Sequence, residues 1–296
     1  MPESSGKIRV GVSGWSYDSW NGAFYPEGLP ARRRLEYASR RFQSIEINGS
    51  FYALQKPHSY RAWHEATPAK FKLAVKGSRF ITHNKKLGDV ETALANFFAS
   101  GILLLGEKLG PILWQLPRQL AFDAGRMQAF FDLLPGDTFA AAKLARRHDE
   151  RVEGRCWTKP IGKHRLRYAI EPRHESFFGP DFVRIARHAG VAIAFADSGS
   201  WPYTEEPTAG FVYMRLHGSP ATYASRYSGT DIARWATRIR AWRRGAEPAG
   251  AKRITDLAPP RRKARDVYVY FDNDHNAYAP RNALELIDRL GLHAGS

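Results

Sequence analysis

The sequence contains a single cysteine, Cys156, among 296 residues. One cysteine excludes an intramolecular disulfide and any cysteine-rich zinc or iron–sulfur site. Long apolar runs are also missing, because the longest compact aliphatic block, residues 102–105, falls far short of the roughly 20 residues that span a membrane. The first residues include no apolar core of signal-peptide length. We therefore expect a cytoplasmic protein that does not contact a membrane.

Acidic residues are scarce relative to basic ones: 29 Asp and Glu stand against 45 Lys and Arg, which gives a formal net charge of +16. Such an excess favours anionic partners, among them nucleic acid and phosphorylated small molecules. A solvated, arginine-rich surface would have the same composition, so charge alone leaves the partner open. The hydrophobic fraction of 43% is large enough for a packed core. Nothing in the composition indicates an oligomeric state.

Several cofactor and catalytic motifs are absent. The sequence has no G-x-G-x-x-G or Walker pattern, which excludes the usual dinucleotide and ATP loops. It also lacks the G-x-S-x-G nucleophile elbow and the H-E-x-x-H zinc motif. Histidines and carboxylates at strand ends would still be chemically able to bind zinc or manganese. The sequence therefore names no cofactor and leaves a divalent metal site open.

Eight short runs, rich in Val, Ile, Phe and Tyr, are typical of β-strands, and each ends in polar residues. A helix-length segment separates each run from the next, as a parallel crossover requires. This repeat predicts an α/β fold, a single (β/α)8 TIM-type barrel domain over residues 1–296. The runs are residues 8–13, 43–48, 71–76, 111–115, 167–171, 191–197, 211–217 and 267–272.

Two basic insertions interrupt the helical patterns of this barrel. They are residues 140–164, and residues 245–265, which are rich in Ala, Pro, Gly and Arg. We expect the second insertion to be a mobile loop on the face opposite the active site, because it leads into the amino end of the eighth strand. Gly101 lies inside one helical pattern and indicates a break there. The patterns cover residues 32–41, 90–108, 124–134, 180–189, 231–244 and 280–290.

The reacting groups of a TIM barrel lie at the carboxyl ends of its strands. Carboxylates and a histidine at these ends suit general acid–base catalysis, whereas aromatic, amide and basic side chains suit binding of a ligand. We therefore predict that the catalytic residues are Glu46, Glu171, Asp197 and His217. The predicted ligand-binding residues are Trp15, Tyr17, Asn48, Tyr52, Lys76, Gln115, Arg173, His174, Arg215, Asn273 and Asp274.

These groups also have a structural interpretation. Glu171 with Arg215, or Glu46 with Lys76, would form ion pairs that hold the strand ends together. Arg215 and His217 alternate along one strand and point to the same side, where they would form either an anion site or such an ion pair. The aromatic side chains after the first two strands would either stack on a ligand or pack as a loop core.

Seven segments of the sequence resemble signatures of the DUF72, or YecE-like, family, in order along almost the whole chain. The resemblance implies a TIM-barrel fold and brings no established reaction. An analogy with barrel endonucleases that act on damaged DNA rests on the fold alone. The two basic insertions depart from the shortest members of the family. The segments are GVSGWSYDSWNGAFYP (11–26), EINGSFYAL (46–54), FKLAVKGSRFITH (71–83), LGPILWQLP (109–117), EPRHESF (171–177), YMRLHG (213–218) and VYFDND (269–274).

The leading functional prediction is an enzyme that binds a phosphorylated, nucleotide- or nucleic-acid-like ligand at the carboxyl-terminal barrel face. Lys76, Arg173, Arg215 and His217 would bind the phosphate, and the carboxylates would provide acid–base or hydrolytic chemistry. One alternative is a non-catalytic nucleic-acid-binding protein that uses the basic insertions. Another is a metal-dependent isomerase or hydrolase of a sugar phosphate.

Overall fold

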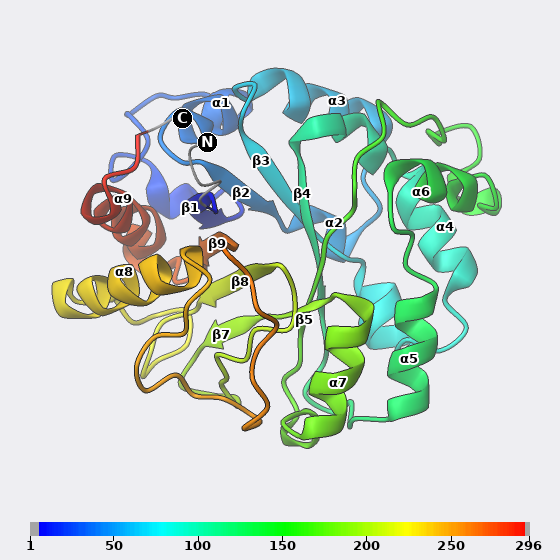
Figure 1. Ribbon diagram of the computed structural model, residues 1–296. Helices are drawn as coiled ribbons and strands as arrows, with labels where there is room; N and C mark the ends of the chain where they lie inside the picture. The colour runs from blue at the N-terminus through cyan, green and yellow to red at the C-terminus, as the bar shows by residue number, and fades with distance from the viewer. Residues whose placement is uncertain (1–5, 294–296) are drawn as a thin grey trace.

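The computed structural model describes residues 6–293 as a ring of parallel strands surrounded by helices (Figure 1). The strands hydrogen-bond in the order β6-β5-β4-β3-β2-β1-β9-β8-β7. They are β1 (Ile8–Ser13), β2 (Ser44–Ile47), β3 (Lys72–Lys76), β4 (Leu109–Gln115), β5 (Tyr168–Glu171), β6 (Ala192–Ile193), β7 (Phe195–Asp197), β8 (Phe211–Leu216) and β9 (Asp266–Phe271).

The ring closes through two short strands that act as one. Only Ala194 separates β6, which pairs with β5, from β7, which pairs with β8. The Ala194 amide keeps the register by donating to the Ile170 carbonyl at 2.8 Å. The predicted eight-stranded barrel is therefore confirmed, and the difference is that its sixth strand, residues 191–197, is split.

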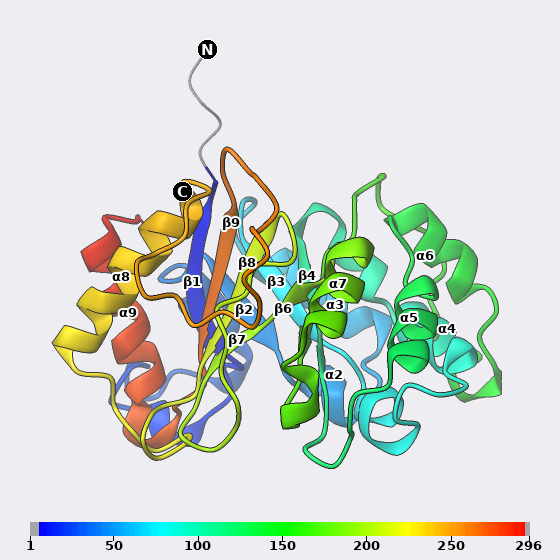
Figure 2. The same ribbon diagram turned by 60° about the horizontal axis from the view of Figure 1, so that its bottom comes forward.

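Helices cover the outside of the ring. Helices α8 and α9 flank one side, and α4, α5 and α6 flank the opposite side (Figure 2). The helices are α1 (Arg34–Ser39), α2 (Gly49–Tyr52), α3 (Pro57–Ala66), α4 (Glu91–Ala99), α5 (Ala124–Asp132), α6 (Thr138–Ala145), α7 (Pro180–Ala189), α8 (Gly229–Arg243) and α9 (Tyr278–Leu290).

Gly101 divides the helical pattern of residues 90–108, as its position predicted. It adopts φ 114°, a left-handed conformation, directly before a 3-10 segment at Ile102–Lys108. A Cβ atom at this position would lie 2.6 Å from the Pro57 Cα atom. The close approach of α3 therefore requires glycine here.

We expect Gly101→Ala to lower the free energy of unfolding by about 2–4 kcal/mol, because it combines backbone strain with a steric clash. Gly28→Ala is the matched control, since Gly28 has φ +73° and a Cβ atom added there would meet no atom within 4 Å. The control should lose about 1 kcal/mol. Urea unfolding of both variants measures the difference, and equal losses would contradict the clash.

The two insertions differ in structure. The first includes most of α6 and a 3-10 turn at Glu150–Val152. Residues 245–265 form no helix or strand, but the buried carboxylate of Glu206 tethers them. Its Oε1 accepts a 2.7 Å hydrogen bond from Arg253 Nη2, and its Oε2 accepts one of 3.0 Å from the Ile254 amide. The mobility of this loop stays a prediction.

The barrel interior has an uncharged middle and charged ends. A separate interior cluster of buried residues includes Ala74 and Ala169. Because side chains alternate along a strand, residues two positions before and after each alanine also point inward. On β3 these are Lys72 and Lys76, and for β5 they are Arg167 and Glu171. The carboxyl end holds the candidate active site.

Candidate active site

Arg215 lies at the centre of a buried charged cluster at the carboxyl ends of the strands. Its side chain is 1% exposed, and its Nη2 lies 2.9 Å from both Glu46 Oε1 and Asp272 Oδ2. Its Nη1 lies 2.9 Å from Glu171 Oε2. The guanidinium on β8 therefore links the ends of β2, β5 and β9.

The hydrogen bonds of Glu46 are completed by two hydroxyl groups. Ser13 Oγ donates to Oε1 at 2.8 Å, and the Tyr213 hydroxyl donates to Oε2 at 2.5 Å. Glu46 thus pairs with Arg215, and no ion pair joins it to Lys76 within the described part of the chain. The ion pair anticipated between Glu171 and Arg215 is present, so the structural interpretation of Arg215 holds.

His217 is fully buried beside this cluster. Its Nδ1 lies 3.0 Å from Asp272 Oδ2, and the rings of Trp201 and Tyr223 pack edge-on against it at 5.1 and 5.4 Å. Arg215 and His217 are therefore closed to solvent, which favours the ion-pair interpretation over an anion site. Three carboxylates already surround the guanidinium, and an anion would have to displace them.

Glu171 is held in its ionised form. Burial alone would raise its pKa, but Arg215 and Arg173 keep it well below the usual range. Arg173 Nη2 lies 2.7 Å from Glu171 Oε1, and its guanidinium stacks over the Trp201 ring at 4.0 Å. A carboxylate with such a low pKa is a poor proton donor at neutral pH, so Glu171 positions the two arginines.

Asp274, by contrast, holds its proton at neutral pH. Burial, and then the charge of Asp272, raise its pKa to about 8, against a smaller opposing effect of Tyr17 and Arg215. Its Oδ1 is buried and has no hydrogen-bond partner among the described residues, and the same is true of Asn48 Oδ1. Tyr17 hydrogen-bonds with both side chains, so the two unpartnered oxygen atoms belong to neighbours of one phenol group.

Lys76 is the cation of the site without an ion-pair partner in the described part of the chain. Its Nζ lies 4.3 Å from the centre of the Phe51 ring. Burial and the neighbouring Arg215 lower its pKa to about 8. The pKa of His83 is lowered to about 4, first by burial and then by Lys76, Arg173 and Arg79. Three positive charges therefore surround one imidazole ring.

Asp197 does not join this cluster. The interior cluster contains Ala192 and Ala194, so alternation turns Asp197 to the outside of the barrel. There it accepts a 2.7 Å hydrogen bond from the Tyr227 hydroxyl. Asp197 lies at the same end of the barrel as Glu46 and Glu171, but its side chain points away from them, and its catalytic role stays a prediction.

The other predicted residues have varied surroundings. Trp15 packs against Trp63 at 5.5 Å, and Gln115 donates to the Leu116 carbonyl at 2.7 Å. Tyr52 on α2 is 69% exposed. His174 Nδ1 accepts a hydrogen bond from the Ser176 amide at 3.2 Å, and Asn273 Nδ2 donates to the Ser225 carbonyl at 2.9 Å. Their roles in binding stay predictions.

Asp272 belongs to the centre of the site but was missing from the predicted residues. It bonds Arg215 and contacts His217. The signal was available, because Asp272 follows Tyr268 and Tyr270 at alternate positions, and both tyrosines point into the barrel. Tyr213 was missed because a tyrosine inside a strand is usually a packing residue.

Two features are absent from the part of the chain between residues 6 and 293. No three His, Cys, Asp or Glu side chains there are grouped so that they could hold a metal ion. No helix in that range combines the length and the apolar character needed to cross a bilayer. The groups available for chemistry at this site are carboxyl, amine, guanidinium, phenol and imidazole side chains.

A parallel barrel with a polar cluster at the carboxyl ends of its strands defines a TIM-type barrel protein. Residues 9–296 match the family described as "Protein of unknown function DUF72", and the chain belongs to this family. The resemblance seen in the sequence motifs is thereby confirmed.

One known relative matches nearly the whole chain and another matches less than half of it. It is 22% identical to the UPF0759 protein YunF of Bacillus subtilis (strain 168) over 324 residues, covering 96% of this chain and 95% of that protein. It is 29% identical to the UPF0759 protein YecE of Escherichia coli (strain K12) over 133 residues, covering 44% of this chain and 45% of that protein.

Solved structures share the fold. A DUF72 family protein of Thermotoga maritima has a TM-score of 0.72 at 22% identity, covering 96% of this chain and 99% of its own. A DUF72 family protein of Enterococcus faecalis has a TM-score of 0.66 at 16% identity, covering 97% of this chain and 98% of its own. At these identities the likeness establishes the barrel architecture.

Proposed function

We propose that this protein is an enzyme that binds a phosphorylated ligand at the carboxyl ends of the barrel strands and hydrolyses it by general acid–base catalysis. The observation that carries the proposal is the contrast between Asp274 and Lys76. At the carboxyl end of the barrel, the Asp274 carboxyl group has a pKa of about 8, and the Lys76 amine lacks an ion-pair partner among the described residues. Pairs of groups with such shifted pKa values are typical of acid–base sites.

Phosphate binding is assigned to the ends of β3 and β5. Lys76, Arg79 and Arg173 all act on His83, so their positive charges converge there. An incoming phosphate would neutralise this excess charge and accept charge-assisted hydrogen bonds. We therefore place the phosphate beside Lys76, which has no ion-pair partner among the described residues, and not beside Arg215 and His217.

The acid is assigned to Asp274. Because the Asp274 carboxyl group is mostly protonated at pH 7, it can donate a proton to the leaving oxygen of a phosphate ester. The exposed rings are Tyr52, at the end of α2 after β2, and Tyr223, on the loop after β8, which are 69% and 43% exposed. Such rings can stack on a base, which supports a nucleotide-like ligand.

Turnover of p-nitrophenyl phosphate and of bis(p-nitrophenyl) phosphate tests the proposal directly. We expect Lys76→Met to raise KM by roughly tenfold or more, because a hydrogen bond from a charged donor is lost. Lys70→Met is the control, since Lys70 is an exposed lysine that precedes the same strand. Its KM should change by less than about twofold.

The same assays separate the alternatives. A non-catalytic binding protein would be stabilised against heat by the phosphate esters without releasing p-nitrophenol at any pH. A metal-dependent enzyme would lose its turnover after treatment with a chelator. Wild-type protein that shows neither turnover nor stabilisation would overturn the proposed function.

A further inference from the structure

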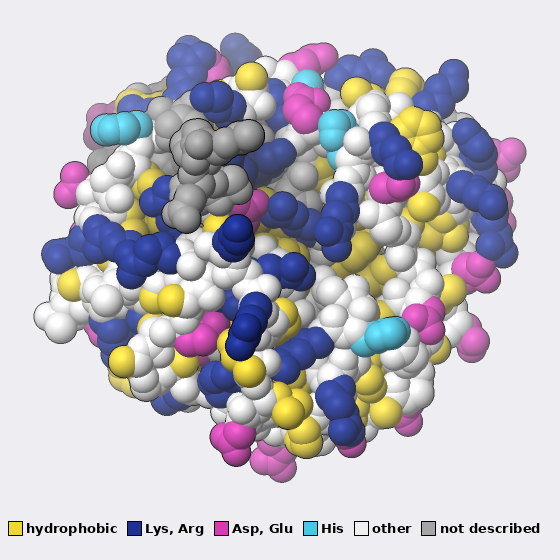
Figure 3. All heavy atoms as spheres, viewed as in Figure 1, with side chains coloured by type: hydrophobic (Ala, Val, Ile, Leu, Met, Phe, Trp, Pro, Cys, Tyr) yellow, Lys and Arg dark blue, Asp and Glu magenta, His cyan; other side chains and the backbone are white. Residues whose placement is uncertain are grey.

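A second polar site lies at the opposite, amino end of the barrel. A hollow of about 690 Å³ opens there between the starts of the strands. Seven Lys and Arg side chains line it, against two carboxylates, Glu107 and Asp266. Figure 3 shows Lys and Arg side chains gathered on the face of the molecule that Figure 1 presents. The candidate active site does not use this surface.

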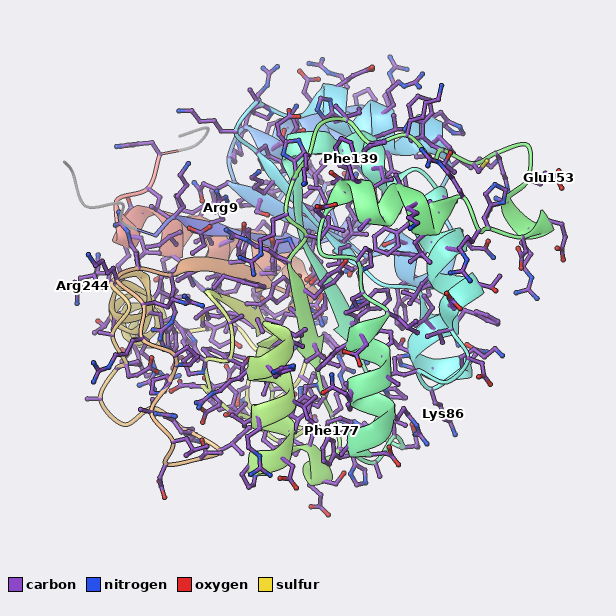
Figure 4. All side chains as sticks on the ribbon, turned by 45° about the vertical axis from the view of Figure 1, so that its right-hand side comes forward. Arg9, Lys86, Phe139, Glu153, Phe177 and Arg244 are labelled. Carbon is purple, nitrogen blue, oxygen red and sulfur yellow. The ribbon has the colours of Figure 1, made fainter. Side chains whose placement is uncertain are left out.

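The floor of the hollow carries inward-pointing cations. Arg167 Nη1 lies 2.6 Å from Asp266 Oδ2, and Arg9 Nη1 lies 3.7 Å from the same oxygen. Arg9 stands near the start of β1 (Figure 4), and its Nη1 is buried without a hydrogen-bond partner among the described residues. One carboxylate thus serves two guanidinium groups.

Lys72 adds a third cation to the floor. Its amine donates to the backbone carbonyl of Glu107, which leaves its charge without a carboxylate partner in the described structure. Burial, and then the charges of Arg9 and Arg167, lower the pKa of Lys72. Lys72, Arg9 and Arg167 repel one another, and a bound anion would offset this repulsion.

The rim comes from the two basic insertions. The first supplies Lys163 and leads into Arg165, and the second supplies Arg262. Lys163 lies 3.7 Å from Asp137, whereas Arg165 and Arg262 are exposed and make no ion pair with any described residue. Segments about a hundred residues apart in the sequence therefore deliver cations to one hollow.

The aromatic residues of the hollow are unavailable for stacking. Phe211 and Tyr268 are 4% and 3% exposed. Arg167 lies over the Phe211 ring at 5.6 Å, and Arg9 lies over the Tyr268 ring at 5.1 Å. Single-stranded nucleic acid is held largely by stacking on free rings, so these surroundings favour an anion without bases.

We propose that the amino-end hollow is a binding site for a linear phosphate chain of three or more phosphoryl groups. Arg9, Lys72 and Arg167 would bind the buried end of the chain, and Arg165 and Arg262 would bind the end nearer solvent. The site is separate from the proposed active site, because the barrel interior lies between them. Free polyphosphate and the triphosphate of a nucleotide share this chemistry.

Isothermal titration of the full chain with inorganic tripolyphosphate, ATP and a short oligothymidylate tests the assignment. We expect tripolyphosphate to bind the wild type, and the double variant Arg165→Gln/Arg262→Gln to weaken its affinity by roughly tenfold or more. Arg32→Gln/Arg146→Gln is the matched control. It removes the same charge from exposed arginines that do not line the hollow, and should change the affinity by less than about twofold.

The titration with ATP shows whether the phosphate chain belongs to a nucleotide. Tighter binding of ATP than of tripolyphosphate would assign a nucleotide, and equal or weaker binding would assign the phosphate chain itself. The proposal would be overturned if tripolyphosphate did not bind, if both double variants lost affinity equally, or if only the oligothymidylate depended on Arg165 and Arg262. The titrations are repeated in a Lys76→Met background, which removes a phosphate ligand of the proposed active site. There Arg165→Gln/Arg262→Gln should still weaken tripolyphosphate binding by roughly tenfold or more, so failure of this site and failure of the proposed active site are distinguishable.

Discussion

Arg215→Ala is expected to lower the free energy of unfolding by about 3–5 kcal/mol, because removing one partner of a buried ion pair leaves the other charges uncompensated. The guanidinium is 1% exposed and contacts Glu46, Glu171 and Asp272 at 2.9 Å each. Water cannot replace it without opening the barrel end. Urea unfolding at pH 7 measures the loss.

The loss should depend on pH. In the wild type the pKa of Glu171 lies well below its usual range, so this carboxylate contributes stability above its unfolded pKa and loses it as the pH falls. Without Arg215 the buried carboxylates are easier to protonate, and the variant recovers relative to the wild type in acid. Arg33→Ala, which breaks an exposed pair with Glu36, is the control and should cost less than about 1 kcal/mol. A deficit that does not narrow toward pH 4 would contradict the explanation.

Asp274→Asn is expected to lower kcat for phosphate esters by about 10²–10⁴, the usual contribution of a general acid. The amide keeps the size of the side chain but cannot give up a proton. The wild-type rate should fall as the pH rises through about 8, where Asp274 loses its proton. Asp288→Asn, at an exposed position on α9, should leave the rate unchanged.

The same variant should be more stable than the wild type in alkaline solution. The folded pKa of Asp274 is raised above the unfolded value, so the wild type binds an additional proton on folding and loses stability as the pH rises from about 4 to about 8. Asparagine does not titrate and removes this loss. Stability curves at pH 5 and pH 8 measure it. A variant that lost both activity and stability at pH 8 would indicate a merely structural carboxyl group.

The elements with strong end signals were predictable from the sequence. Pro180 and Gly190 fix the ends of α7, because proline favours the first turn and Gly190 takes a left-handed φ of 65°. Strand β1 matches the predicted residues for a similar reason, since Ser13 ends an apolar run. Helix α3 (Pro57–Ala66) was missed although a signal was present, because Pro57 stands in its first turn.

Side-chain direction was predictable only where polar and apolar residues alternate. Arg215 and His217 follow Tyr213 on a strand of mixed character, so their common side was apparent. Residues 191–196 are all apolar, and such a run does not distinguish the inside of the barrel from the outside. For this reason the sequence did not show that the Asp197 side chain points out of the barrel. The partners of Arg215 come from strands far apart in sequence, and no local pattern ranks them.

The cross-barrel contacts of Arg215 also bear on whether the chain can be divided. Glu46 belongs to the first half of the sequence, while its ion-pair partner Arg215 and its hydrogen-bond partner Tyr213 belong to the second. A fragment ending after β4 would bury a carboxylate with neither partner, and would also leave β1 without β9. Half-barrels of this protein should therefore fail to fold when expressed separately and should associate when expressed together. Because Arg215 joins the two halves of the sequence, neither half of this barrel can fold and act as an independent unit.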